Sequence, residues 1–110
     1  MSILNVHNEQ VIDSSRAISN IVLRNLFIKM CNEVTDFSEG VRLRVTPFDL
    51  VFSDSNLFEM TITPYRNLFK ISFGERHLHE IRVASLEDFF TALDMALHYF
   101  LSTRESRDHT

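Results

Sequence analysis

The stretch that decides the fold runs from residue 41 to residue 73 and reads VRLRVTPFDLVFSDSNLFEMTITPYRNLFKISF. Apolar and polar residues alternate through most of it, which is the pattern of β-strands with one buried face. The alternating runs are 41–45, 48–53, 57–63 and 68–73, and a further run, HLHEIRV, follows at 77–83. Short turn-forming segments separate them, so we expect neighbouring strands to pair antiparallel in a meander.

The alternation of apolar and polar residues is out of register between the first two runs. The apolar positions of 48–53 are shifted by one residue relative to those of 41–45, and Pro47 lies at the shift. Because proline cannot donate a ladder hydrogen bond, we expect a bulge, a bend or a tight turn at this point. The sequence leaves open whether 41–53 is one bent strand or two strands.

Helical patterns flank this region on both sides. Residues 11–34 carry apolar side chains at helical spacing, which predicts one long helix. A second helix is predicted to begin at SLED (85–88), where Ser85 can cap the N-terminus and Asp88 follows three residues later. Its core face is expected to consist of Leu86, Phe89, Phe90, Leu93, Leu97 and Phe100.

These elements predict an α+β fold, a two-layer sandwich of order α-β-β-β(-β)-α. Because the strands alternate, one face of the sheet is apolar and should carry both helices, while the other face is polar. A chain of 110 residues fits one domain. We predict a flexible N-terminus at 1–10, the domain at 11–102 and a flexible tail at 103–110.

The composition excludes several kinds of site. Gly40 and Gly74 are the only glycines, whereas phosphate-binding loops need several glycines close together. Cys31 is the only cysteine, which excludes an intramolecular disulfide and a cysteine-based zinc site. Its helical, apolar setting favours a buried and inert thiol. The net charge of −4 argues against general binding to nucleic acid or to anionic membranes.

The N-terminal residues, MSILNVHNEQ, do not show the pattern of a signal peptide. No apolar run approaches the roughly 18 residues that a membrane span needs. A reducing compartment also suits a chain without a disulfide. We therefore predict a cytoplasmic protein with no membrane partner and no cofactor.

The segment HLHE (77–80) places two histidines and a glutamate close together, which raises the question of a metal or catalytic site. On a strand, His77 and His79 project to the same face, as two imidazoles must in order to share a metal. Glu80 is adjacent to His79 and projects to the opposite face. We therefore interpret the segment as a polar strand entry, with no metal and no catalytic residue. A metal-dependent or acid–base enzyme centred on His77, His79 and Glu80 is kept as an alternative.

The polar face of the predicted sheet is the expected contact surface for another protein. Its members are Arg42, Arg44, Glu59, Thr61, Lys70 and Arg82. The cations could contact phosphates, so nucleic-acid binding is a second alternative. Glu59 and Glu80 can pair with these cations across strands, and the face lacks the aromatic pair on which RNA-recognition sheets stack bases. Both observations disfavour nucleic acid.

The first helix carries more apolar surface than a small sheet would cover. Four residues widen its apolar stripe: Leu23, Phe27, Ile28 and Cys31. A twofold interface covers the same patch on both copies, so we predict a homodimer through these side chains. The sequence contains no nucleophile elbow and no His-Glu-x-x-His helix. It therefore predicts a small, non-enzymatic protein–protein interaction module, of adaptor, chaperone or inhibitor type, that acts as a homodimer.

Overall fold

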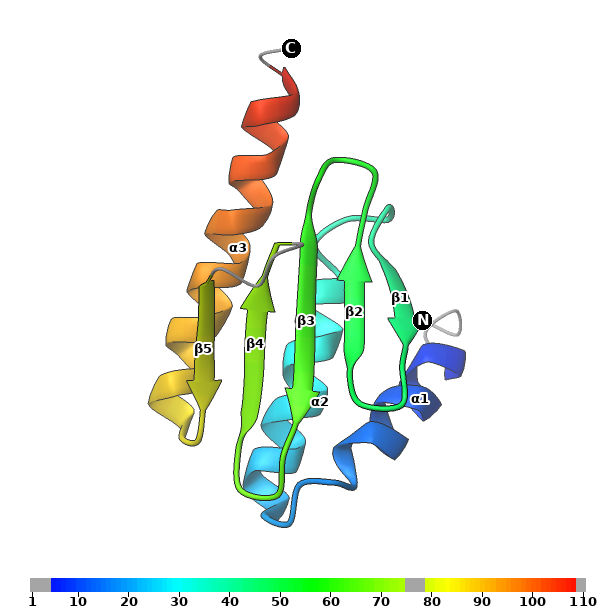
Figure 1. Ribbon diagram of the computed structural model, residues 1–110, viewed down its shortest axis with the longest axis vertical. Coiled ribbons are helices and arrows are strands. Elements are labelled where there is room, and N and C mark those ends of the chain that lie inside the picture. The colour runs from blue at the N-terminus through cyan, green and yellow to red at the C-terminus, as the bar shows by residue number, and fades with distance from the viewer. Residues whose placement is uncertain (1–4, 75–78, 109–110) are drawn as a thin grey trace.

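The computed structural model describes residues 5–74 and 79–108. Within them the chain forms three helices and five strands (Figure 1). The helices are α1 (Asn5–Ser15), α2 (Ile21–Thr35) and α3 (Leu86–Asp108). The strands are β1 (Arg42–Val45), β2 (Leu50–Ser53), β3 (Glu59–Pro64), β4 (Phe69–Phe73) and β5 (His79–Val83).

The strands form one antiparallel sheet in the order β1-β2-β3-β4-β5, so each strand pairs with its neighbour in sequence. This confirms the predicted α+β meander. Residues 41–53 form two strands because Thr46 closes a tight turn between them. Its N–H donates to the carbonyl oxygen of Asp49 at 2.9 Å, and its hydroxyl donates to the Asp49 carboxylate at 2.6 Å. Pro47 lies inside this turn, where no ladder hydrogen bond is required.

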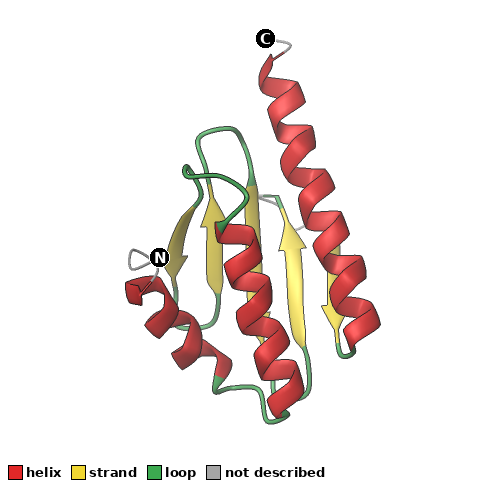
Figure 2. Cartoon of the chain, turned by 180° about the vertical axis from the view of Figure 1, so that it is seen from behind, coloured by secondary structure: helices red, strands yellow, loops and turns green. Residues whose placement is uncertain are grey.

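The helices cover one face of the sheet and leave the other face open, which gives the predicted two layers (Figure 2). α2 lies between α1 and α3 on this face, with α3 on the side of β5 and α1 on the side of β1. α3 is therefore the outermost helix on the β5 side. Over the described residues, none of the helices combines the length and the apolar character that crossing a membrane requires.

The helical region before the sheet is two helices rather than the single predicted helix at 11–34. α1 ends at Ser15, and the Asn20 side chain then caps α2 by accepting from the N–H groups of Val22 (2.8 Å) and Leu23 (3.2 Å). Apolar spacing continues across the break because Ile18, in the connection, is fully buried. Periodicity alone therefore could not show where one helix ends and the next begins.

Both ends of the chain contribute more regular structure than expected. α1 begins at Asn5, within the segment 1–10, and α3 continues to Asp108, past the expected domain end at 102. In the last part of α3, Thr103 is buried and the Arg104 guanidinium lies 3.4 Å from the Asp54 carboxylate. The part of α3 around Thr103 and Arg104 is therefore attached to the body of the domain.

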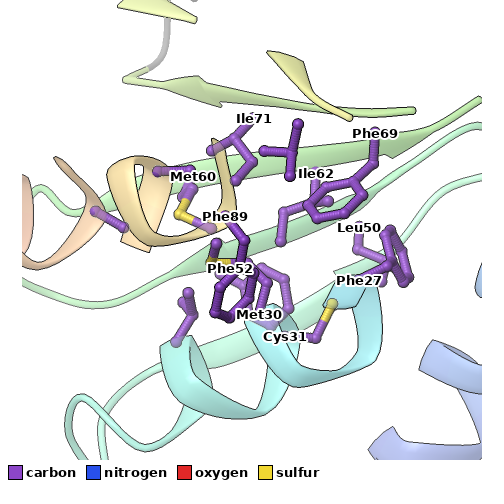
Figure 3. Packing of buried hydrophobic residues seen from close by; sticks show 14 of the residues in the cluster. Phe27, Met30, Cys31, Leu50, Phe52, Met60, Ile62, Phe69, Ile71 and Phe89 are labelled. Carbon is purple, nitrogen blue, oxygen red and sulfur yellow. The ribbon is translucent and has the colours of Figure 1, made fainter. Parts of the chain in front are cut away.

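The core lies between the sheet and the helices (Figure 3). Phe27, Met30 and Cys31 of α2 meet the apolar face of the sheet, and Phe89 of α3 closes the same cluster. The rings of Phe27 and Phe69 pack edge to face, with their centroids 5.5 Å apart. Such aromatic pairs contribute about 0.5–1.5 kcal/mol beyond the area that they bury.

The face that α3 turns to the core differs from the predicted one. Phe89 and Phe100 are buried as expected, and Ala92 and Ala96 lie between them on the same face. The small alanines let the helix backbone approach the sheet, so the core face is centred on them. Three of the residues expected in the core are exposed instead: Leu86, Phe90 and Leu97. Leu93 is half-buried and packs against the edge of the core.

Candidate protein-binding surface

The open face of the sheet carries all six residues of the predicted contact surface. The strand register places Thr61 beside Val51 and Ser72, Lys70 beside Arg82, and Glu59 beside Ser53. Arg42 and Arg44 lie on β1, opposite Ser53 and Val51. Since side chains alternate along a strand, these positions share the face that the helices leave open (Figure 1).

The residues at the centre of this face are buried, and the charged residues surround them. Thr61 is only 4% exposed, and its neighbours Val51 and Ser72 are similarly buried. Thr61 therefore cannot be a contact residue, which corrects that part of the prediction. Arg42 and Arg44 on β1 and Arg82 on β5 are exposed. Four inter-strand spacings, about 19 Å in total, separate these two edges of the sheet.

A cavity of about 500 Å³ opens at one end of this face, beside the turn between β3 and β4. It is lined by Tyr65, Arg66, Asn67, Leu68, Lys70 and Arg82. Two backbone hydrogen bonds hold the turn in place. The Tyr65 N–H donates to the Leu68 carbonyl oxygen, and the Ser19 N–H donates to the Arg66 carbonyl oxygen, each at 2.8 Å. One of these hydrogen bonds lies within the turn, and the other ties the turn to the α1–α2 connection. Together they hold the residues that line the cavity in place.

The cavity is positively charged. Lys70 is partly neutralised because its Nζ lies 3.6 Å from the Glu80 carboxylate, and it also lies 5.8 Å from the centroid of the Tyr65 ring. Arg66 and Arg82 are exposed and make no ion pair with any described residue. Three cations against one carboxylate leave a net charge of about +2 beside an aromatic ring. Such a site suits a ligand that carries negative charge and a flat or apolar group.

The structure places His79 and Glu80 on opposite faces of β5, as strand parity predicts. His79 is paired with Phe73, whose side chain belongs to the core face, whereas Glu80 reaches Lys70 on the open face. His77 lies outside the described residues. Among the residues that the structure does describe, no three His, Cys, Asp or Glu side chains are grouped so that they could hold a metal. The enzyme alternative has gained no support from the placement of Glu80.

The residues predicted to form a dimer interface lie in the core of a single chain. Leu23 is 7% exposed, Phe27 and Cys31 are fully buried, and Ile28 is partly buried against the same cluster. Burial raises the pKa of the Cys31 thiol, which agrees with an inert cysteine. Side chains buried within one chain cannot also contact a second copy, so this location for the interface is corrected. The apolar residues that stay exposed on α2 are instead Ile21 and Val22, in its first turn.

Sequence reasoning missed four of the cavity residues: Tyr65, Arg66, Asn67 and Leu68. They form a turn, and a turn was interpreted only as a separator of strands. The signal was present in PYRN (64–67), where an aromatic and a cation stand next to each other at the end of a face that carries Lys70 and Arg82. Comparisons with known protein families, with curated proteins and with solved structures found no match. The surface is therefore interpreted from its own residues.

Proposed function

We propose that this protein is a small, non-enzymatic interaction module that binds an acidic segment of another protein through the open face of its sheet. The single observation that supports the proposal is the cavity beside the β3–β4 turn. There Arg66 and Arg82, which make no ion pair with any described residue, line the same cavity as Tyr65. Planar guanidinium groups bind carboxylates through two parallel hydrogen bonds, which gives direction as well as charge.

The size and charge of the site favour a protein segment over a nucleic acid. A nucleic-acid backbone needs a continuous row of cations that matches its phosphates. Here Glu59 and Glu80 lie on the same face, and Arg42 and Arg44 stand at the far edge from the cavity. A cavity of about 500 Å³ has room for one acidic side chain together with a neighbouring apolar group. Further polar contacts of the partner would extend across the face toward β1.

The homodimeric state and the cytoplasmic location remain part of the proposal. Cys31 is a buried free thiol, which suits a reducing compartment. An adaptor, chaperone or inhibitor role requires only that the contact surface stays rigid and accessible. The open sheet face supports such a role, because hydrogen-bonded strands build it and the helices cover only the opposite face.

The test begins with peptides selected on the wild-type protein from a random 12-residue display library. We expect the selected peptides to be rich in Asp or Glu and to contain an aromatic or aliphatic residue. Their affinity, measured by fluorescence anisotropy, should fall at least tenfold in the Arg66→Glu/Arg82→Glu variant because both guanidinium groups are replaced by like charge. The matched control is Arg42→Glu/Arg44→Glu, which reverses the same number of charges at the other edge of the same face.

Two results would overturn the proposal. One is a selection without enrichment of acidic residues, and the other is equal loss of affinity in the cavity variant and the control variant. Retention of the wild-type protein on DNA at low salt, with release that depends steeply on salt, would instead favour the nucleic-acid alternative.

A further inference from the structure

A row of exposed apolar side chains runs along α3. Leu86 is 55% exposed, Phe90 57%, Leu97 41% and Leu101 50%. Successive members lie within about 60° of one another around the helix, and the row is about 22 Å long at 1.5 Å per residue. α3 is the outermost helix on the β5 side, so a neighbouring molecule can approach it (Figure 2). We call these four residues the α3 stripe.

The spacing of the α3 stripe is symmetric. Leu86 precedes the midpoint between Leu93 and Asp94 by as many residues as Leu101 follows it, and the same holds for Phe90 and Leu97. A copy of α3 running in the opposite direction would therefore place Leu86 against Leu101 and Phe90 against Leu97, twice over. Self-complementarity of this kind is what a twofold interface requires.

We propose that a second copy of this chain covers the α3 stripe, by antiparallel pairing of the two α3 helices about a twofold axis close to Leu93 and Asp94. The inference deepens the homodimeric part of the proposed function and rests on it. It moves the interface from four residues of α2 that pack in the core (Leu23, Phe27, Ile28 and Cys31) to the α3 stripe, whose residues are exposed. The contact surface on the open sheet face stays free in both copies.

Two features limit the strength of this dimer. The stripe is one helix wide, so the interface falls at the small end of the range for specific complexes. Asp94 of each copy also lies beside the axis, which brings two like charges close together. We therefore expect a dimer that forms at concentrations on the order of 10–100 μM.

Single introduced cysteines test the antiparallel arrangement directly, because the native Cys31 is buried. Asp94→Cys places its thiol beside the axis, within the Cα separation of about 4.4–6.8 Å that a disulfide needs. It should give a covalent dimer under mild oxidation. Phe90→Cys alone should not, because its two copies are offset by about 10 Å along the helices. A mixture of Phe90→Cys and Leu97→Cys should give the mixed dimer. Thr91→Cys, on the exposed polar side of α3, is the control.

The proposal is overturned if the Asp94→Cys protein and the mixture give no more cross-linked dimer than Thr91→Cys, or if Phe90→Cys cross-links alone as efficiently as the mixture. A stripe that serves a helix of a different protein would give the first of these results. In sedimentation at increasing concentration, Leu97→Glu should weaken self-association at least tenfold, whereas Thr91→Glu should leave it within twofold of wild type. A wild-type chain that is still monomeric at about 500 μM contradicts the proposal independently.

The outcome is separable from that of the peptide experiment. Leu97→Glu does not touch the cavity, so a folded monomeric variant should bind the selected acidic peptides as wild type does. Loss of cross-linking with intact peptide binding would overturn only the α3 pairing. Cross-linking with no acidic peptide selected would overturn only the proposed binding of an acidic segment.

Discussion

Replacing Arg104 with alanine tests whether the last turns of α3 are part of the fold. The Arg104 guanidinium lies 3.4 Å from the Asp54 carboxylate, donates to the Ser38 hydroxyl at 3.0 Å, and lies 4.5 Å from the centroid of the Phe100 ring. The Asp54 side chain is only 1% exposed. Its Oδ1 accepts from the backbone N–H groups of Asn56 and Phe58, and among the described residues its buried Oδ2 forms an ion pair only with Arg104.

The expected cost follows from these contacts. Removing one partner of a buried ion pair costs about 3–5 kcal/mol, because a charge is left without compensation. The Arg104 side chain is 31% exposed, so water can partly replace it, and we lower the figure to about 2–3 kcal/mol. Loss of the cation–ring contact with Phe100 adds about 0.5–1 kcal/mol. We therefore expect Arg104→Ala to lower the free energy of unfolding by about 3 kcal/mol.

Urea unfolding followed by circular dichroism measures this change, with Glu105→Ala as the matched control. Glu105 is the next residue and is exposed, so its replacement should change stability by no more than about 0.5 kcal/mol. In an Asp54→Asn background, the loss caused by Arg104→Ala should shrink by at least about 1 kcal/mol, because the buried charge is already absent. An Arg104→Ala protein as stable as Glu105→Ala would show that the reasoning is wrong.

Three further predictions concern stability. Phe27→Ala should lower the free energy of unfolding by about 3–5 kcal/mol in urea, because it opens a cavity in the core; a loss below about 1 kcal/mol would contradict the burial of that ring. Gly74 has φ of +81°, so Gly74→Ala should cost about 1–2 kcal/mol in thermal unfolding, and an unchanged midpoint would contradict the strained turn. Burial raises the pKa of Tyr99 above its usual 10.0, so the fold favours the neutral phenol. That stability is present below pH 10 and is lost as the pH rises through the folded pKa. Wild type should therefore lose stability relative to Tyr99→Phe between pH 9 and pH 11, and parallel profiles would refute the shift.

The sheet was predictable because its signal is local. Alternation in each run fixes which side chains share a face, and short turns fix which strands are neighbours. These two facts place Arg42, Arg44, Lys70 and Arg82 on one face without any tertiary information. They could not reveal that Thr61 is buried, because exposure on a sheet depends on the neighbours across strands.

The helices were less predictable because apolar residues occupy more than one side of them. Ile18 lies in the connection between α1 and α2 and is buried, so the apolar spacing continues through that connection. The connection ends at Asn20, which caps α2. On α3, either the side with Phe89 and Phe100 or the side with Phe90 and Leu97 could have met the sheet. Close packing at the alanines decides between them, and that choice is made by contact with the strands rather than by the pattern of the helix itself.

The cavity lay beyond sequence reasoning for a related reason. Tyr65 and Arg66 belong to a turn, and only the folded chain brings that turn beside Lys70 and Arg82. The hydrogen bond from the Ser19 N–H to the Arg66 carbonyl oxygen joins segments that are far apart in the chain, so no local sequence pattern could predict it.

The strand order β1-β2-β3-β4-β5 also has a consequence for how the chain folds. Every strand pairs with the one made just before it, so each pairing closes only a short loop and requires little loss of chain entropy. The sheet can therefore grow hairpin by hairpin from its N-terminal end, with α2 already available to cover it. α3 follows the whole sheet in the chain, and it brings Phe89 and Phe100 to the core. Rapid folding is expected from such local connectivity, with completion of the core delayed until the C-terminal helix has left the ribosome.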